Sequence, residues 1–250
     1  MRTAIVTGGA RRIGAAICRA LAADGWHLLI HCRRSRAEAE ALAAELRNAK
    51  VVVADLTAAD AGTAVIAGLA GLPPARLLVN NAAMFDHDQA TRFDAAGWDA
   101  HLAVNARAPA LLAMEFARQA PKGSVIVNLS DAKLAAPNPD FFSYTVSKYA
   151  LAGVTELLAR ALAERGIRVC AIAPAVTMVS GRQSRADFDR VHAMNALGVG
   201  VDVEEIIAAL RFILAAPSLT GQTLSIDGGQ RFLGLARDVQ FLADPAEARA

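Results

Sequence analysis

Cysteine is scarce in this chain, and its scarcity argues against two kinds of structure. Only three cysteines occur among the 250 residues, Cys18, Cys32 and Cys170, and they lie far apart in segments that we expect to be helix or strand. They form neither the paired spacing of a metal site nor a disulfide framework. We therefore expect no bound metal and a reducing compartment.

Net charge and long apolar runs are lacking too. The formal net charge is only +2, which is too balanced to favour nucleic acid as a partner. No apolar run reaches the length of a transmembrane span, and a strand that begins at about Arg2 leaves no room for a signal peptide. We expect a soluble cytoplasmic protein that binds neither nucleic acid nor a membrane. A local anionic ligand is indicated by the arginines near the N-terminus, Arg11, Arg12, Arg33, Arg34 and Arg36.

Apolar sequence is abundant, and it is arranged in alternating segments. Hydrophobic residues make up 54% of the chain, which suits strands buried on both faces. Strand-like and helix-like segments alternate, which predicts an α/β fold: a single doubly wound (Rossmann-type) parallel sheet of about seven strands with helices on both faces. The expected strands are Arg2–Val6, Trp26–His31, Lys50–Ala54, Arg76–Asn80, Ser124–Leu129, Ile167–Ile172 and Thr223–Ile226.

The segments between these strands are expected to be helices, with one exception. Residues 176–201 contain three glycines and no clear periodicity, and we expect an irregular loop there. The expected helices are Ile13–Ala23, Arg36–Arg47, a helix capped by Thr57 and running to about Leu69, Ala95–Gln119, Phe142–Glu164 and Val203–Ala215.

Tyr144 and Lys148, in the stretch SYTVSKYAL, lie one turn apart on the same face of a helix. A phenol titrates near ~10 and is a poor proton donor at neutral pH. A fixed ammonium beside it favours the phenolate, so we expect a lowered pKa for Tyr144. Such a pair suits a reaction in which hydride adds to a C=O or C=N carbon while the neighbouring heteroatom takes a proton. An ordinary amphipathic helix is the alternative.

The first turn between strand and helix reads TGGARRIGAA and predicts a phosphate site. A glycine turn that leads into a helix places backbone N–H groups and the positive end of the helix dipole against a phosphate. Gly8 and Gly14 occupy positions where a tight turn and a close backbone approach are needed. Arg12 stands where many dinucleotide turns have a middle glycine. Either the turn binds no nucleotide, or the arginine serves the phosphates and the active site; we favour the second interpretation.

Six motifs in order resemble those of the short-chain dehydrogenase/reductase family, over essentially the whole chain. TGGARRIG resembles its cofactor turn, NNAA its NNAG motif and AIAPA its PG segment, with Ala83 and Ala175 in place of glycine. LTGQTLSIDGG matches its C-terminal signature. Asn105 in VNARAP resembles the asparagine that holds a proton-relay water, and Tyr144 and Lys148 match the catalytic pair.

The resemblance implies roles for further residues. Lys148 would also hold the nicotinamide ribose, Thr177 would face the carboxamide, and Asp55 with Leu56 would meet the adenine. A homotetramer packed through two long helices is implied as well. The implied cofactor-binding set is Gly8, Arg11, Arg12, Ile13, Gly14, Arg34, Ser35, Asp55, Leu56, Asn81, Ala82, Tyr144, Lys148, Pro174 and Thr177.

Asp131 occupies the position, thirteen residues before the tyrosine, where the family normally has its catalytic serine. Ser130 is one residue away, and a one-residue step on a strand turns a side chain to the other face. Within the family, an aspartate here together with an arginine in the glycine turn resembles pteridine and dihydromonapterin reductases. Phe85 then matches the ring that stacks a pterin, so that Phe85, Arg12 and Asp131 would form the substrate site. The alternatives are a solvated acid at Asp131 and a rim hydrophobe at Phe85.

The segment HCRRSR, after the second expected strand, indicates NADPH as the cofactor. NAD-binding enzymes usually place an Asp or Glu there for the ribose hydroxyls, but no acid occurs before Glu38. Arg34 and Ser35 can instead offer a fork of donors and a hydroxyl to a 2′-phosphate. The alternative, a basic helix start on the surface, would be poorly placed against the helix dipole.

Together these patterns predict a single dinucleotide-binding and catalytic domain, residues 1–250, with residues 176–201 as a substrate loop. The expected enzyme is an NADPH-dependent oxidoreductase that reduces a C=N bond of a dihydropterin-type substrate. Tyr144 would be the proton donor or relay, Asn105 would link it to solvent, and a protonated Asp131 would serve a second ring nitrogen. Two alternatives stay open: a generic carbonyl or alcohol dehydrogenase acting on a small ketone or sugar, and a non-catalytic nucleotide-binding regulator.

Overall fold

Seven parallel strands form one sheet in the structure, a computed structural model that describes residues 1–178 and 185–242. Their order across the sheet is β3-β2-β1-β4-β5-β6-β7. The predicted Rossmann-type α/β fold is thereby confirmed. The strands are β1 (Thr3–Val6), β2 (His27–Cys32), β3 (Ala49–Val53), β4 (Ala75–Asn80), β5 (Val125–Leu129), β6 (Arg168–Pro174) and β7 (Thr223–Ile226).

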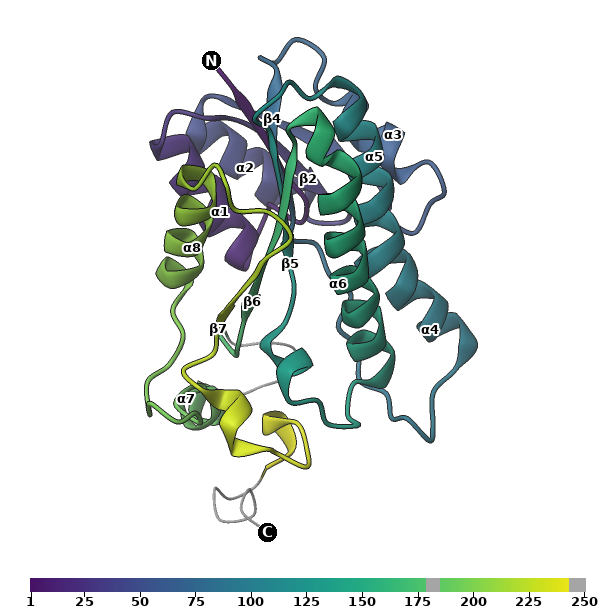
Figure 1. Ribbon diagram of the computed structural model, residues 1–250, viewed down its shortest axis with the longest axis vertical. Helices are drawn as coiled ribbons and strands as arrows, with labels where there is room; N and C mark the ends of the chain where they lie inside the picture. Colours follow the sequence, from purple (N-terminus) through teal and green to yellow (C-terminus); the bar gives the residue numbers. More distant parts are fainter. Residues whose placement is uncertain (179–184, 243–250) are drawn as a thin grey trace.

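Helices bury the sheet on both faces (Figure 1). Side chains alternate along each strand, so Ala4 and Val6 of β1 join the core on one face and Ile5 joins the core on the other. The first face is covered by α1 (Arg12–Ala23), α2 (Arg36–Leu46) and α8 (Val203–Ala215). The second is covered by α3 (Ala61–Ala67), α5 (Ala108–Gln119) and α6 (Phe142–Leu162), and α4 (Ala95–Leu102) packs on α6.

The strand order reverses beside β1, which pairs with β2 on one side and with β4 on the other. At such a switch point the connections leave in opposite directions and open a crevice at the carboxyl ends of the strands. The first glycine turn follows β1 directly, and Asp131 follows shortly after β5. Topology therefore brings the predicted phosphate turn and the predicted catalytic residues to the same edge of the sheet.

The helix predicted over Ala95–Gln119 is divided in the structure. A π-helical turn, Ala103–Arg107, separates α4 from α5. Pro109 lies in the first turn of α5 and has no N–H to donate to the carbonyl of Asn105, four residues earlier. The change from α to π spacing occurs at this point, and π turns are frequent at functional sites.

The helix predicted to start at Thr57 starts instead at Ala61, with Asp60 at its N-cap. Thr57 is engaged elsewhere, because its backbone N–H and its hydroxyl both donate to Oδ1 of Asp55, at 2.9 and 2.8 Å. This Asx-type turn keeps the chain from entering the helix for another turn. It also fixes Asp55 at the edge of the crevice.

The segment predicted to be an irregular loop contains a helix, α7 (Arg185–His192). Val191 on this helix is fully buried and packs with Leu235, Val239 and Leu242 from the C-terminal segment. These partners are distant in sequence, so the local pattern did not reveal the helix. Residues 179–184 of the predicted substrate loop lie outside the described residues.

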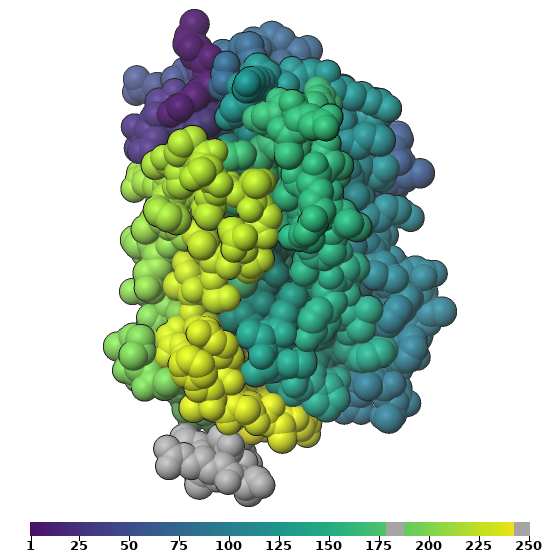
Figure 2. Space-filling model, in the orientation of Figure 1, coloured from purple at the N-terminus to yellow at the C-terminus, as the bar shows by residue number. Residues whose placement is uncertain are grey.

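The C-terminal segment carries two 3₁₀ turns after β7, Gln230–Leu233 and Val239–Phe241. In Figure 2 this segment, in yellow, lies on the surface beside the teal residues that follow β5. It thus reaches the same end of the molecule as the crevice. Across residues 1–178 and 185–242, no helix combines the length and the apolar character that a membrane span needs.

Candidate active site

A cavity of about 910 Å³ lies at the carboxyl edge of the sheet and is lined by residues that follow β1 to β6. Every residue that the sequence predicts to bind the cofactor lines this cavity, and so do Phe85 and Asp131. Asn105 is not among the lining residues. One cavity therefore collects nearly all the predicted site residues, while their individual roles stay predictions.

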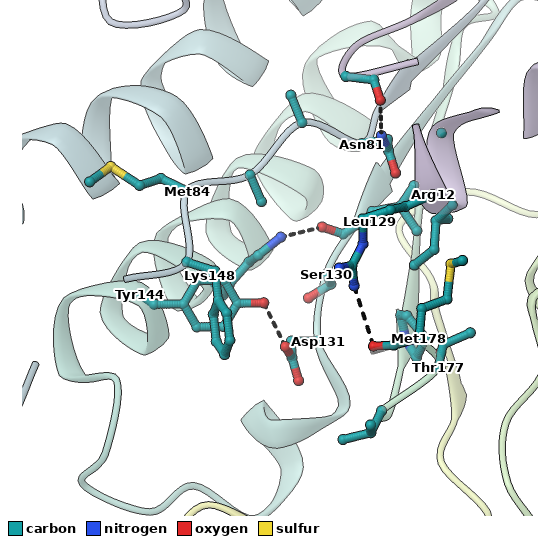
Figure 3. A pocket seen from close by; sticks show the side chains of 18 of the residues that line it. Arg12, Asn81, Met84, Leu129, Ser130, Asp131, Tyr144, Lys148, Thr177 and Met178 are labelled. Atoms are coloured by element: carbon teal, nitrogen blue, oxygen red, sulfur yellow. Dashed lines mark hydrogen bonds between the residues drawn. The ribbon is translucent and has the colours of Figure 1, made fainter. Parts of the chain in front are cut away.

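The glycine turn has the close geometry that its sequence predicts. Gly8 has φ +60°, a conformation that glycine adopts without strain, and a Cβ on Gly14 would collide with the carbonyl oxygen of Gly8. Arg12 also has a left-handed φ, +54°, which costs a non-glycine residue about 1–3 kcal/mol. The turn thus demands at position 12 the conformation that a middle glycine would supply. The Arg12 guanidinium donates to the carbonyl of Met178 at 3.3 Å (Figure 3).

A buried histidine that the sequence analysis did not single out supports this turn. Nδ1 of His31 accepts a hydrogen bond from the backbone N–H of Gly8 at 3.2 Å, so the ring proton is on Nε2, which lies 3.1 Å from the carbonyl of Ala54. Burial lowers the pKa of His31, which favours this neutral ring. The imidazole thereby ties the glycine turn after β1 to the end of β3, where Asp55 and Leu56 line the cavity.

The far end of the cavity is rich in arginine. Arg33 Nε lies 3.2 Å from Asp55 Oδ2, an ion pair between half-exposed side chains. Arg34 and Ser35 follow and also line the cavity; the Ser35 side chain makes no capping hydrogen bond to α2. No carboxylate occupies the end of β2, where ribose hydroxyls would need one.

Tyr144 and Asp131 face each other at the opposite end. The phenolic O–H of Tyr144 donates to Asp131 Oδ2 at 2.5 Å (Figure 3). The other carboxylate oxygen, Oδ1, accepts from the backbone N–H of Lys133 at 2.8 Å. Burial is the largest influence on this carboxyl and raises the pKa of Asp131, although both hydrogen bonds act in the opposite direction. The structure therefore makes Asp131 the hydrogen-bond partner of Tyr144, and a carboxyl that retains its proton more readily than usual.

The expectation of a lowered pKa for Tyr144 is wrong for the protein as described. Burial and the Asp131 carboxyl raise the pKa of Tyr144 well above 10. Lys148, only 3% exposed, donates from Nζ to the carbonyl of Leu129 at 2.6 Å (Figure 3). Burial lowers the pKa of Lys148 itself to about 8. Burial of the phenol and the neighbouring Asp131 carboxyl thus raise the pKa of Tyr144 by more than the Lys148 ammonium lowers it.

Asn105 lies behind the cavity wall and uses its carboxamide for support. Its Oδ1 accepts from the N–H of Met84 at 2.8 Å, and its Nδ2 donates to the carbonyl of Met84 and to Ser147 Oγ, both at 2.9 Å. These bonds join the loop after β4 to the helix that carries Tyr144. The link from Asn105 to solvent stays a prediction.

Phe85 forms an aromatic wall beside Tyr144. Its ring stacks on Phe141 at 4.3 Å between centroids and meets the ring of Tyr144 edge to face at 4.6 Å, with 38% of the residue exposed. Phe141, the residue before α6, is held with φ +53°. Phe85 is therefore neither a loose rim residue nor part of the core: it is fixed in the wall and partly open to the cavity.

Charged residues that the sequence did not single out hold the C-terminal segment at this end. Lys133 Nζ lies 3.1 Å from Asp238 Oδ2 and donates to the carbonyl of Asp140 at 2.7 Å. Arg237 Nε donates to Asp140 Oδ2 at 2.7 Å. Lys133 and Asp238 line the cavity. Their pairing joins segments about a hundred residues apart, which no local sequence pattern indicates.

The family model for short chain dehydrogenases matches residues 2–198. The chain belongs to the short-chain dehydrogenase family. It is accordingly an NAD(P)-dependent oxidoreductase. In the part of the chain that the structure describes, no cluster of three or more His, Cys, Asp or Glu residues could hold a metal ion.

Several solved structures and characterised proteins are similar to this short-chain dehydrogenase over most of its length. The FolM alternative dihydrofolate reductase 1 of Brucella canis, complexed with NADP, is 42% identical; the match covers 92% of this chain and 94% of that one with a TM-score of 0.88. A blue fluorescent protein from a metagenomic library, in complex with NADPH, is 31% identical over 92% and 97% of the two chains, with a TM-score of 0.83. The galactitol 2-dehydrogenase (L-tagatose-forming) of Cereibacter sphaeroides is 36% identical over 90% and 93%.

Proposed function

We propose that the protein reduces a C=N bond of a dihydropterin-type substrate with NADPH. The observation that carries the proposal is the 2.5 Å hydrogen bond between Tyr144 and Asp131, at the position where the family normally has a serine. A serine hydroxyl would steady a carbonyl oxygen, whereas a buried carboxyl that keeps its proton can serve a basic ring nitrogen. The similarity to a dihydrofolate reductase of Brucella canis supports a pterin-like substrate.

The residues that line the cavity suit the parts of NADPH. At Gly8 an added Cβ would meet a neighbouring backbone atom at 3.0 Å, and at Gly14 it would collide with the carbonyl oxygen of Gly8, so the turn offers bare backbone there to a pyrophosphate. Arg34 and Ser35 would hold the 2′-phosphate, and Lys148 and Thr177 the nicotinamide end. The homologous structures from Brucella canis and from the metagenomic library contain NADP and NADPH. When bound, NADPH supplies the hydride for the reduction.

Tyr144 and Asp131 would then control the proton. Burial raises the pKa values of both groups, so each keeps its proton to a higher pH than the free side chain would. Tyr144 would donate to the ring nitrogen beside the reduced carbon, and Asp131 would return a proton to the phenolic oxygen across the short hydrogen bond. Lys148, charged at neutral pH, favours the transient phenolate. Phe85 would stack on the flat ring of the substrate, and Arg12 would hydrogen-bond a ring acceptor.

A second candidate is the reduction of a small ketone or sugar. The galactitol 2-dehydrogenase of Cereibacter sphaeroides and an L-xylulose reductase of Mesocricetus auratus, 32% identical, favour it. Against it, Asp131 stands where a serine hydroxyl would steady a carbonyl oxygen, and once Asp131 has given up its proton its negative charge would repel an alkoxide. The third alternative, a non-catalytic regulator, has little support beside an assembled Tyr144, Lys148 and Asp131 set.

We also propose a homotetramer in the cytoplasm, packed through α5 and α6. These helices expose apolar side chains, Met114 on α5 and Tyr149 and Leu157 on α6, at 44%, 46% and 67%. Exposed apolar patches of this kind often mark interfaces. Sedimentation equilibrium tests the assembly; a monomer at micromolar concentration would contradict it.

Steady-state oxidation of NADPH tests the proposed function. Purified protein is assayed with a panel of dihydropterins, dihydrofolate, simple ketones and ketoses. We expect turnover of the dihydropterins with the highest kcat/KM. Turnover of ketoses alone would establish the sugar reductase instead, and no turnover of any compound would favour the regulator.

A further inference from the structure

The loop that carries Phe85 is fixed at every second residue. Met84 bonds through its backbone N–H and carbonyl to Asn105. The backbone N–H of Asp86 donates to His101 Nε2 at 3.2 Å. Asp88 accepts from the backbone N–H and hydroxyl of Ser143, at the start of α6. The two residues between these anchors, Phe85 and His87, both place their rings against Phe141.

His101 is built into this arrangement as an acceptor. It is only 2% exposed, in the last turn of α4. A backbone N–H can only donate, so Nε2 of His101 must accept from Asp86; the ring proton is then on Nδ1, 2.8 Å from the carbonyl of Gly97. Both ring nitrogens are used, and they allow one tautomer only.

His101 and Asn105 act on the two sides of Phe85. They are four residues apart, one on the last turn of α4 and the other on the π turn that follows. Asn105 holds the residue before Phe85 and His101 holds the residue after it. Because both backbone neighbours are bonded to buried side chains, the Cα–Cβ direction of Phe85 is fixed, and its ring has little freedom beyond rotation about its own side-chain bonds.

We propose that His101 is a positioning residue for substrate recognition: through Asp86 it holds Phe85 at the place where the ring contacts the flat substrate. The inference rests on the proposed function only in the identity of that substrate. An alternative explanation is that His101 merely satisfies a buried N–H and stabilises the fold. The two explanations predict different results. If His101 positions Phe85, then the effect of a His101 substitution on KM for the substrate depends on the Phe85 ring; if His101 only stabilises the fold, then it does not.

A double-mutant cycle measures this dependence. His101→Phe keeps a ring of similar size and removes both hydrogen bonds, His101→Gln keeps a donor and an acceptor, and Phe85→Leu removes the aromatic face. Thr155→Val is the matched control. The buried hydroxyl of Thr155, on α6, donates to the carbonyl of Leu151 and accepts from Asn128 of β5, away from the Phe85 loop. Each protein is assayed for kcat and for KM of a dihydropterin, and for Kd of NADP⁺ by calorimetry.

We expect His101→Phe to raise KM for the dihydropterin about tenfold, equivalent to about 1.4 kcal/mol, with the Kd of NADP⁺ unchanged. His101→Gln, which keeps a donor and an acceptor, should have a KM close to that of wild type. In the Phe85→Leu background, His101→Phe should raise KM for the dihydropterin little further. Thr155→Val should leave KM unchanged. Should His101→Phe fail to fold, His101→Met, which also lacks both ring nitrogens, replaces it in the cycle with Phe85→Leu.

Two results would overturn the inference: additive losses in the cycle, or an equal loss of NADP⁺ affinity. A wild-type protein that ignores dihydropterins would contradict the proposed function instead. In that case the same cycle is measured with the compound that it does reduce, and non-additivity between positions 85 and 101 still decides whether His101 acts through Phe85.

Discussion

The hydroxyl of Tyr144 donates to Asp131 Oδ2 at 2.5 Å, while Lys148 donates to the carbonyl of Leu129 at 2.6 Å. The acid, and not the ammonium, is therefore the direct partner of the phenol. The site therefore has a carboxyl beside the phenol that can give up a proton, which the hydroxyl of a serine at position 131 would do far less readily. This hydrogen bond leads to predictions for Tyr144 and Asp131, and the residues at the other end of the cavity lead to predictions for Arg34 and His31.

The first prediction concerns the hydroxyl of Tyr144. Tyr144→Phe keeps the ring beside Phe85 and removes the proton donor, so turnover should fall by the ~10²–10⁴-fold that the loss of an acid–base group costs. The Kd of NADP⁺ should change little. The matched control is Tyr149→Phe, since Tyr149 lies on an exposed part of α6 and its hydroxyl donates to the carbonyl of Leu134. Near-normal turnover in Tyr144→Phe would refute its role.

The second prediction concerns stability and pH. Burial raises the pKa of Asp131 above its ordinary 3.8, so between these two values the folded chain binds a proton that the unfolded chain has lost. Stability attributable to this group is present below pH 3.8 and is lost as pH rises through the folded pKa. Asp131→Asn cannot ionise, and it should raise Tm at pH 8 relative to wild type, by about 2–4 °C for each ~1 kcal/mol in a domain of this size.

Thermal unfolding of wild type and Asp131→Asn from pH 4 to pH 8 measures this difference. Asp99→Asn, on the exposed surface of α4, is the control. The Tm difference between Asp131→Asn and wild type should grow with pH, and no such growth should appear for Asp99→Asn. A constant difference across the range would show that burial does not hold the proton on Asp131.

The third prediction concerns the choice of cofactor. The end of β2 has no carboxylate, and Arg34 lines the cavity there, so the protein should bind NADPH over NADH by at least about tenfold, or ~1.4 kcal/mol. Arg34→Ala should remove most of this preference by weakening NADPH alone. Arg36→Ala is the control, because Arg36 pairs with Glu40 on exposed α2. Equal affinities of wild type for the two cofactors would contradict the assignment.

The fourth prediction concerns His31. Burial lowers the pKa of His31, and Asp55 is the charged group that faces it. Protonation of Nδ1 would place its N–H against the N–H of Gly8, so NADP⁺ affinity should fall as pH drops through the lowered pKa of His31, below the ordinary ~6.5. His31→Asn keeps an acceptor for Gly8 and cannot be protonated. Because the 2′-phosphate also titrates near ~6, the decisive quantity is the ratio of Kd values between wild type and variant, which should rise at acidic pH; a flat ratio would contradict the role.

The sequence predicts the fold and most of the cavity because both depend on short-range patterns. Alternating segments specify the sheet, and β1 leads directly into the glycine turn, so Gly8 and Gly14 reach the crevice by topology. Tyr144 follows Asp131 by thirteen positions, across one strand end, one turn and one helix start. Their meeting therefore follows from the same topology.

The features that sequence reasoning missed depend on contacts between distant segments. Helix α7 is stabilised through Val191 by Leu235 and Val239, and its own sequence has few apolar residues. His101 gains its role only because the loop after β4 lies on it. The direction of the Tyr144 pKa was wrong for a similar reason: the nearby ammonium is visible in the sequence, whereas the burial that outweighs it is a property of the packed structure.

The central claim is that Asp131 adapts this short-chain dehydrogenase to a ring nitrogen rather than to a carbonyl oxygen. The most direct test is kcat/KM for a dihydropterin and for a small ketone, measured with NADPH in wild type and in Asp131→Ser side by side. We predict that the substitution lowers dihydropterin reduction by the ~10²-fold or more expected for a lost proton donor, and raises ketone reduction. Undiminished dihydropterin reduction by Asp131→Ser, or a wild-type protein that reduces only the ketone, would contradict the account.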